Sequence, residues 1–228
     1  MRYNGLCLVI QMAASRLADA RIDRYQTAIL LGAIREDYWY LCGLGRVVES
    51  LSIEHFHGPG LPGGFIPFLS PSARSSGLRL YRKALRESRA GRLTSAFVQL
   101  GRCAHLLADM ACPVHVQRVA HLNDPYEWYV EANRLSLSRE PVPEPRRLPE
   151  IGDLFDGLSA YTARFAADGT SSVHGRWYKK LGWRRALSRD EVAAQARAII
   201  PVAASYIAAL FKKFLLDSQP RFFHTEYN

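Results

Sequence analysis

The chain has 228 residues, of which 48% are hydrophobic and 22% charged, and its formal net charge is +9 at pH 7. This length supports one sizeable hydrophobic core, and the composition excludes a disordered chain. The basic balance favours a polyanionic partner such as nucleic acid, an anionic lipid surface or a phosphorylated substrate, although a merely basic surface explains it equally well.

The N-terminal segment begins with Met1-Arg2 and continues with an apolar run over residues 5–10, which faintly resembles a signal peptide. The run is short and passes directly into a helical pattern of apolar residues. Strand signals are scarce along the whole chain, and we therefore predict an all-α fold. The expected helices span residues 6–20, 24–35, 44–53, 73–90, 92–112, 123–137, 151–167 and 188–217.

Pro and Gly crowd two stretches between these helices. Residues 57–72 are predicted to form a long surface loop, and residues 139–149 a Pro-rich crossing. Neither resembles a domain linker, because the helices on both sides need a shared core to cover their apolar faces. We expect residues 1–228 to form a single domain, a multi-helix bundle.

The last predicted helix begins with a capping box made by Ser188 and Glu191, and Pro201 is expected to kink it. Charged residues and this proline interrupt the apolar run over 193–216. That pattern favours a core helix over a transmembrane segment.

The most informative segment contains His105, Asp109, Pro113 and His115. His105 and Asp109 are four residues apart on a predicted helix, so their side chains share one face and could share one ion. In a straight helix His115 would lie about 15 Å further along the axis. Pro113 is expected to bend or end the helix, which frees His115 to face a second ion. Imidazole and carboxylate ligands in this mixture suit zinc.

An isolated histidine–aspartate pair at this spacing more often belongs to a core helix with one buried histidine and an ordinary surface aspartate. The neighbouring segments favour a metal site over this structural interpretation. Four of the seven histidines, and several isolated carboxylates, lie in segments that resemble the rest of a metal-site pattern.

That pattern resembles the zinc-dependent phospholipase C family and its relatives, the fungal single-strand-specific nucleases. The family's HxxxDxxxPxH helix matches residues 105–115, and its upstream segments match Gly32-Ala33 with Asp37, and Glu54-His55-Phe56-His57. The likeness is specific between about residues 31 and 131 and continues as helical pattern to about residue 217. It implies an all-α bundle with two zinc ions between helices. The implied metal ligands are Asp37, His55, His105, Asp109, His115, His121 and Glu127.

The sequence departs from the family pattern in two places. The family's last ligand pair is HxxxE, whereas His121 and Glu127 are six residues apart, with Asp124 between them as a possible substitute. Members with three metals also use the amino group of an N-terminal tryptophan and a histidine on the first helix. Here the chain begins with Met1, and Cys7 stands about where that histidine would be. We therefore expect two zinc ions and a third site that is absent or altered. The choice between Cys7 as a ligand and as a buried structural thiol stays open.

Two divalent ions sharing a carboxylate can polarise a phosphoryl oxygen and activate a water as hydroxide. The resemblance therefore implies a metal-dependent hydrolase of phosphate ester bonds. Asp37 is the candidate catalytic residue, either as a ligand, as the group that orients the attacking water, or as both. The sequence shows no serine-hydrolase, P-loop or dinucleotide-binding motif.

The substrate is less visible in the sequence. Aromatic residues near the expected metal site could stack a nucleobase or enclose a choline-like headgroup. These residues are Tyr38, Trp39, His57, Phe65 and Phe68, and the candidates for holding a phosphate are Arg35, Arg102 and Arg118. The loop around Phe65 and Phe68 could also enter a lipid interface, which would be a peripheral membrane contact.

Three functions stay open at this stage: a phospholipase C-like hydrolase, a nuclease-type phosphodiesterase acting on single-stranded nucleic acid, and a non-catalytic helical module stabilised by metal. The family is usually secreted or located in the cell envelope, but the N-terminal signal is weak. A secreted or periplasmic location and a cytoplasmic one are both open.

Overall fold

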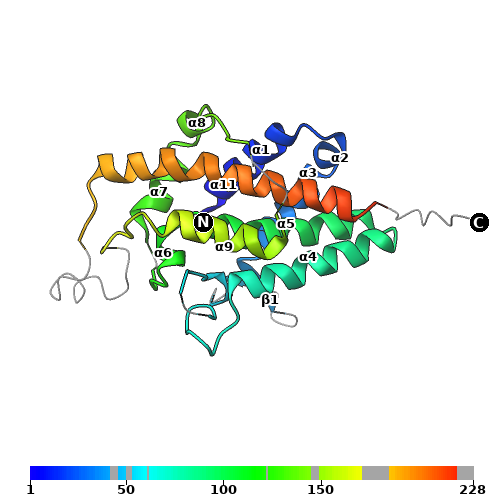
Figure 1. Cartoon of the computed structure of the whole chain (residues 1–228), viewed down its shortest axis with the longest axis horizontal. Helices are drawn as coiled ribbons and strands as arrows, with labels where there is room; N and C mark the ends of the chain where they lie inside the picture. The colour runs from blue at the N-terminus through cyan, green and yellow to red at the C-terminus, as the bar shows by residue number, and fades with distance from the viewer. Residues whose placement is uncertain are drawn as a thin grey trace, which may run out of the picture.

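Helices make up nearly all of the regular structure in the computed structural model, which describes residues 1–41, 46–49, 53–60, 62–121, 123–144, 149–170 and 185–219 (Figure 1). The all-α prediction is confirmed apart from one small hairpin. The helices are α1 (Tyr3–Leu17), α2 (Ala20–Arg24), α3 (Gln26–Arg35), α4 (Ala73–Arg89), α5 (Leu93–Asp109), α6 (Pro113–Val116), α7 (Pro125–Ala132), α8 (Arg134–Leu137), α9 (Ile151–Thr162) and α11 (Arg189–Asp217).

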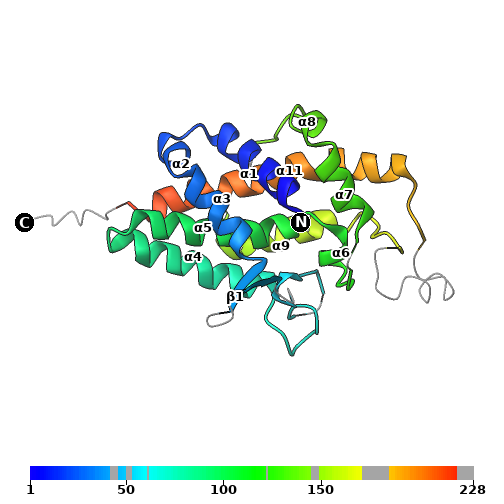
Figure 2. The same ribbon diagram turned by 180° about the vertical axis from the view of Figure 1, so that it is seen from behind.

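Helix α5 is the central element, buried along most of its length from Ala96 to Asp109. It packs between α3 and α4 and also contacts α11 (Figures 1 and 2). The contact with α3 is close because each helix presents a glycine to the other. A Cβ atom on Gly101 would lie 1.9 Å from the carbonyl oxygen of Ile29, and one on Gly32 would lie 2.0 Å from that of Val98. This approach brings the C-terminal end of α3 against the middle of α5.

Helix α11 covers the other side of the bundle, where it packs on α1, α5, α7 and α9. It begins with the expected capping box of Ser188 and Glu191 and continues through Pro201. By length and composition α11 could cross a membrane, but 72% of its most apolar stretch is buried. This burial agrees with the expected core helix. The buried hydrophobic side chains of the described residues form one continuous cluster.

The helix expected over residues 44–53 is wrong. Strand β2 (Arg46–Glu49) pairs antiparallel with β1 (Tyr38–Leu41), with Tyr38 opposite Glu49, and a 3₁₀ turn, η1 (Ile53–His55), follows. Leucine and valine at 44, 47, 48 and 51 fit helical spacing, but the β-branched pair Val47-Val48 and the aromatic run opposite it favour strands. Residues 42–45 and 50–52 lie outside the described chain.

Other boundaries shift by a few residues. The helix expected over 123–137 is divided at Asn133 into α7 and α8, and the one over 151–167 ends at Thr162. The described residues of the 57–72 segment contain no helix, in agreement with the predicted loop. The same holds for 139–144 and 149 in the Pro-rich crossing, whereas 145–148 lie outside the described residues.

Candidate metal centre

The C-terminal end of α5 carries the two residues that the sequence places on one helical face. His105 Nε2 lies 3.2 Å from Asp109 Oδ2, and both side chains are fully buried. Helix α5 ends at Asp109, and α6 begins with Pro113 at its first position, so the predicted break is present. The turn brings His115 Nδ1 to 3.9 Å from Asp109 Oδ2. Asp109 therefore lies between the two histidines.

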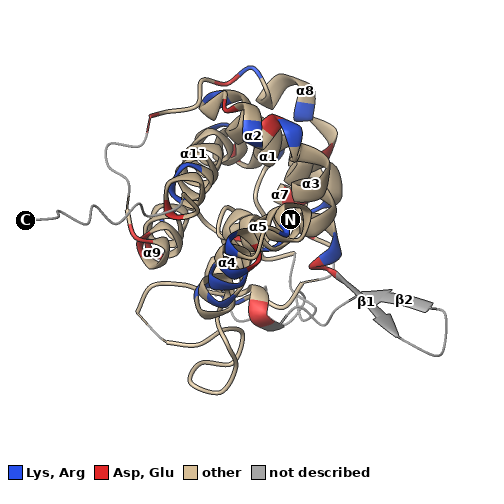
Figure 3. Cartoon of the chain, turned by 90° about the vertical axis from the view of Figure 1, so that its right-hand side faces the viewer, with Lys and Arg blue, Asp and Glu red and all other residues tan. Residues whose placement is uncertain are grey.

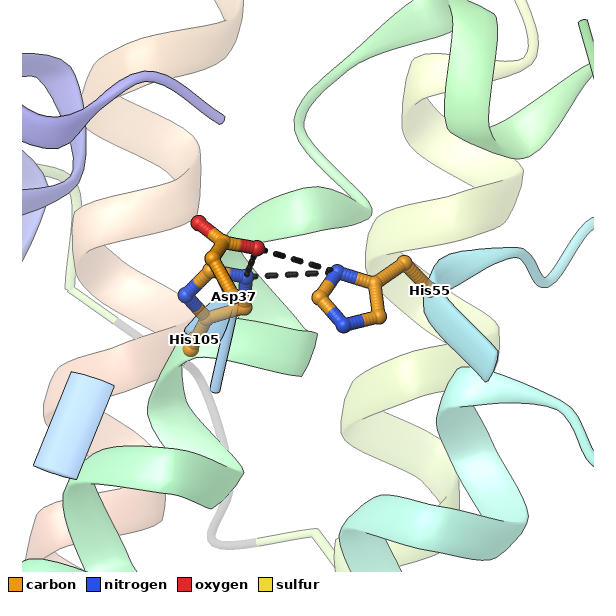
Figure 4. Close-up of side chains that lie close together, drawn as sticks. All are labelled: Asp37, His55 and His105. Carbon is orange, nitrogen blue, oxygen red and sulfur yellow. Dashed lines mark hydrogen bonds and ion pairs between the residues drawn. The ribbon is translucent and has the colours of Figure 1, made fainter. Parts of the chain in front are cut away.

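Asp37 and His55 reach the same place from different elements (Figure 4). Asp37 follows the end of α3, and His55 is the last residue of η1. His55 Nδ1 lies 2.7 Å from Asp109 Oδ2 and 3.3 Å from His105 Nε2. Asp37 Oδ1 lies 3.3 Å from His105 Nε2 and 3.7 Å from His55 Nδ1. Four side chains from three separate parts of the chain thus meet around one point.

These separations match the edges of a zinc coordination tetrahedron. Nitrogen and oxygen ligands about 2.0–2.1 Å from a zinc ion stand about 3.3 Å from one another in a tetrahedron. The separations given above for Asp37, His55, His105 and Asp109 run from 2.7 to 3.7 Å. The ligand atoms of Asp37, His55 and His105 all lie within 4.8 Å of one another and could hold one ion, and Asp109 Oδ2 lies beside both histidines.

A second group of donors lies on the other side of Asp109. Cys112, His115 and Glu127 each offer one ligand atom within 4.8 Å of the others. Glu127 Oε1 lies 3.5 Å from His115 Nε2 and 3.5 Å from Cys112 Sγ. His121 stands further out, with Nε2 3.9 Å from Glu127 Oε2. The seven residues predicted from the sequence are thus brought together, in two groups that meet at Asp109.

Backbone carbonyl groups orient three of the four histidines. Nδ1 of His105 lies 2.8 Å from the oxygen of Ala33, Nδ1 of His115 lies 3.0 Å from that of His55, and Nδ1 of His121 lies 2.9 Å from that of Val119. A carbonyl oxygen only accepts hydrogen bonds, so each Nδ1 carries a proton and Nε2 is the ring atom left to bind a metal. Burial alone would lower the pKa of His105, but Asp37 and Asp109 raise it to about 10, so its Nε2 would have to give up a proton to bind a metal. In all three residues Nε2 points to a carboxylate of the site. Metal-binding histidines are held in this way.

The charges of the site also call for a cation. Asp109 Oδ2 is fully buried and makes no hydrogen bond with the imidazoles that surround it. Burial alone would raise the pKa of Asp109, but the Met1 amino group and His115 lower it well below its ordinary range. Burial would likewise raise the pKa of Glu127, and the same two neighbours lower it. Buried carboxylates kept in the ionised form need compensating positive charge, which the Met1 amino group and His115 supply here and which a bound metal ion could also supply.

The α-amino group of Met1 lies inside this site, 2.5 Å from Asp109 Oδ1 and 3.1 Å from Glu127 Oε1. Sequence reasoning did not place this group or Cys112 at the centre. The signal for Cys112 was its position three residues before His115, with Pro113 between them. Burial raises the pKa of the Cys112 thiol well above its ordinary value, so the thiol is protonated here and would have to lose its proton to bind a metal.

Two residues left open by the sequence have other roles in the structure. Asp124 is the N-cap of α7, where its side chain accepts a hydrogen bond from the amide of Glu127. Cys7 is half-buried on α1 and belongs to neither donor group of the described residues. Burial raises the pKa of the Cys7 thiol. Both findings favour structural roles.

The candidate substrate-binding aromatics are dispersed. His57 Nε2 pairs with Asp156 at 2.8 Å. Phe65 packs against Phe56, with ring centroids 5.0 Å apart, and Phe56 in turn stacks on His115. Phe68 is 73% exposed. The side chains of Tyr38 and Trp39 lie outside the described part of the structure.

Two of the candidate phosphate-binding arginines, Arg102 and Arg118, have partners outside the two donor groups. Arg102 pairs with Glu36 at 2.5 Å, and Arg35 is exposed at the end of α3. Arg118 donates hydrogen bonds to backbone carbonyls of the 57–72 loop.

Comparison with known proteins identifies the fold. The sequence matches no protein-family model and no curated protein. The structure is similar to the alpha toxin from Clostridium absonum, with a TM-score of 0.68, 17% identity and coverage of 96% of this chain and 67% of the toxin. It is also similar to a Clostridium perfringens alpha-toxin isolated from an avian strain, with a TM-score of 0.67, 14% identity and coverage of 94% and 63%. The chain therefore has the fold of about two thirds of these toxins.

Proposed function

We propose that this protein is a zinc-dependent hydrolase of phosphate esters that acts as a phospholipase C. Clostridial alpha-toxin, whose fold the chain shares, is a zinc phospholipase C. The support from the chain itself is the convergence of the seven predicted ligand residues, whose histidines direct a ring nitrogen toward the carboxylates of the site.

One observation favours catalysis over a purely structural metal site. The side chain of Asp37 is 34% exposed, whereas those of His55, His105 and Asp109 are 4%, 0% and 0% exposed. A structural zinc site is closed by protein ligands, and a catalytic site keeps one open position. The exposed edge at Asp37 offers such a position to water and substrate.

Asp37 is placed to handle the attacking water. Burial alone would raise the pKa of Asp37, but the neighbouring His105 lowers it below its ordinary value. The carboxylate is therefore ionised at neutral pH and can accept a hydrogen bond from water at the open edge. The remaining ligands hold the ions, and their carbonyl partners fix their orientation. Zinc, when bound, would acidify a water and polarise the phosphoryl group.

Activity measurements on the zinc-loaded protein test this proposal. We expect hydrolysis of phosphatidylcholine to diacylglycerol and phosphocholine, loss of hydrolysis in EDTA and recovery with zinc. Asp37→Asn should lower the rate by about 10²–10⁴-fold if Asp37 assists proton transfer. Glu36→Gln is the matched control, because Glu36 is adjacent but pairs with Arg102.

Two other outcomes would overturn the lipase assignment. Hydrolysis of single-stranded DNA without hydrolysis of phosphatidylcholine would identify a nuclease-type phosphodiesterase. Zinc binding without hydrolysis of either substrate would identify a metal-stabilised, non-catalytic module.

A further inference from the structure

The loop between η1 and α4 carries the main group of exposed apolar side chains in the described chain. Ile66 is 49% exposed, Phe68 73% and Leu69 82%. The other large exposed hydrophobic residues occur singly on α1, α3, α5, α7, α8 and α11. Single exposed apolar residues need no explanation, whereas a cluster indicates an interaction site. We call Ile66, Phe68 and Leu69 the loop tip.

The loop is held by many hydrogen bonds and presents its tip in a fixed way. The amide of Phe68 bonds to the carbonyl of Pro62, and the amide of Gly64 bonds to that of Ser70. Arg118 donates from Nε to the carbonyl of Gly64 at 2.9 Å. The tip is therefore braced against α6 and its following turn, although none of its three side chains is covered.

Phe68 adopts a conformation that is costly for a bulky residue. Its φ angle is +65°, in the left-handed region that favours Gly and Asn. Such strain costs about 1–3 kcal/mol and persists where the surroundings impose it, often at functional sites. The hydrogen bonds of the loop hold the backbone in this conformation, and Phe68 stays 73% exposed. The loop therefore keeps a bulky apolar side chain directed outward.

The outer face of α4, which directly follows the loop, is strongly basic. Arg82, Arg86 and Arg89 form no ion pair within the described part of the chain, and Arg79 pairs with Glu54 across a partly exposed surface. Spacings of three or four residues place these side chains on one helical face. The exposed cations of this basic face are Arg79, Arg82, Lys83, Arg86 and Arg89.

The loop tip and the basic face lie on the same side of the molecule. The loop projects from the lower edge in Figures 1 and 2, and α4 runs along that edge. Figure 3, turned by 90°, again shows the loop below α4, with Lys and Arg on the lower outer side of that helix. A flat partner, such as a membrane, could therefore contact the loop tip and the basic face at the same time.

We propose that this face docks on an anionic phospholipid bilayer, with the loop tip inserted among the acyl chains and the basic face of α4 against the headgroups. Apolar side chains that enter a bilayer, together with flanking Lys and Arg, are the combination that binds membrane surfaces. Nucleic acid would explain the basic face, and Phe68 could stack on a base, but the aliphatic side chains of Ile66 and Leu69 gain little from either a base or a phosphate. The combination favours lipid.

Docking in this orientation would bring the metal centre close to the bilayer. Phe65, from the same loop, packs on Phe56, and Phe56 stacks on His115 with ring centroids 5.1 Å apart. The inference thus gives the proposed hydrolase a membrane source of substrate. The docking itself does not need zinc, and it can be tested with catalysis switched off.

Binding to vesicles in EDTA, measured by co-sedimentation, tests the proposal. We expect binding to phosphatidylcholine vesicles that contain phosphatidylglycerol and weaker binding to vesicles of phosphatidylcholine alone.

The pair Phe68→Asn and Leu69→Ser should weaken binding by about tenfold or more, because each inserted side chain contributes free energy of burial. Asn tolerates the left-handed backbone at position 68. The pair Arg82→Gln and Arg86→Gln should weaken binding by about fivefold per arginine and reduce its salt dependence.

Matched controls come from α8, which lies at the opposite edge of the molecule in Figure 1. Leu135 is 74% exposed there, and Arg134 and Arg139 are exposed on and just after that helix. Leu135→Ser, and Arg134→Gln with Arg139→Gln, should leave vesicle binding unchanged. Equal binding by loop, basic-face and control variants would overturn the proposal. So would binding of single-stranded DNA that depends on the basic face in a protein that ignores vesicles. Either result would leave the hydrolase proposal standing, because that assay uses zinc and measures product.

Discussion

Backbone carbonyls determine how the metal-site histidines are presented. Ala33, at the end of α3, bonds to Nδ1 of His105, and the carbonyl of His55 bonds to Nδ1 of His115. The backbone of α3 thus orients His105, and the backbone of η1 orients His115. Because His55 belongs to the first donor group and its carbonyl holds His115 of the second, the two groups are linked directly. A side chain at this site cannot be removed without leaving buried carboxylates uncompensated.

We expect His105→Ala to abolish tight binding of one zinc ion. The loss of affinity should exceed the roughly 10- to 100-fold typical of removing an outer hydrogen bond, because a direct ligand is lost. Zinc content after dialysis against a weak chelator measures it. His57→Ala is the control, since His57 pairs with Asp156 outside the two donor groups. Equal zinc content in both variants would exclude His105 as a ligand.

At the scale of secondary structure, the contact between α3 and α5 builds the first donor group. The paired glycines Gly32 and Gly101 let the helices approach closely. That approach puts the carbonyl of Ala33 against His105 and the residue after the helix, Asp37, beside it. The metal site therefore depends on residues that carry no chemistry themselves.

Gly101→Ala should both destabilise the protein and weaken zinc binding. The new methyl group would collide with the backbone of Ile29, which cannot rotate away, and overpacking of this kind costs about 1–3 kcal/mol. Chemical denaturation and zinc titration measure the two effects. In Gly157→Ala the added Cβ would meet mainly the end of the Tyr206 side chain, so that variant should lose little. If Gly101→Ala lowered stability without changing zinc affinity, the link between the helix contact and the site would be broken.

We expect the contribution of the α11 capping box to protein stability to depend on pH. Hydrogen bonds from Arg185, together with the amide of Ser188, lower the pKa of Glu191 from 4.5 to about 2. A carboxyl group whose pKa is lowered by folding stabilises the protein above its unfolded pKa and loses this effect as pH falls through the folded value. Glu191→Gln should therefore be less stable than the parent at pH 7, by an amount that vanishes between about pH 4.5 and 2. The effect should be small and weakened by salt, because the group is exposed.

Denaturation midpoints across this pH range measure the difference. Asp190→Asn removes the same charge from the same turn, but among the described residues no hydrogen bond links Asp190 to Arg185 or Ser188. Its stability difference should change less with pH than that of Glu191→Gln. Parallel pH profiles for the two variants would contradict the assignment.

Local patterns predicted those parts of the site whose residues are close in sequence. The spacing of His105 and Asp109 and the break at Pro113 follow from helix geometry and proline stereochemistry, and both are present. The approach of Asp37 and His55 depends on how α3, η1 and α5 pack, so only the family resemblance indicated it. The β1–β2 hairpin was missed because its apolar spacing also fits a helix. The Met1 amino group was missed because sequence alone does not show that α1 starts beside Asp109.

At the scale of the whole molecule, the exposed positive charge and the candidate metal ligands lie in different places. The basic residues of α4 line an outer face beside the loop tip, whereas Asp109 and Glu127 of the candidate metal centre are buried inside the helix bundle. Under the two proposals above, the basic surface would determine where the molecule binds, and the buried carboxylates would serve the reaction there. The alpha-toxins are longer proteins, of which this chain covers 67% and 63%.

Anomalous X-ray diffraction at the zinc absorption edge, from crystals of the zinc-loaded protein, would show whether the converging residues bind zinc. We expect two peaks, one among Asp37, His55, His105 and Asp109 and the other beside His115 and Glu127, each at bonding distances of about 2.0–2.3 Å from its ligands. A map with no zinc peak at these residues, or with zinc bound only elsewhere on the surface, would contradict this expectation.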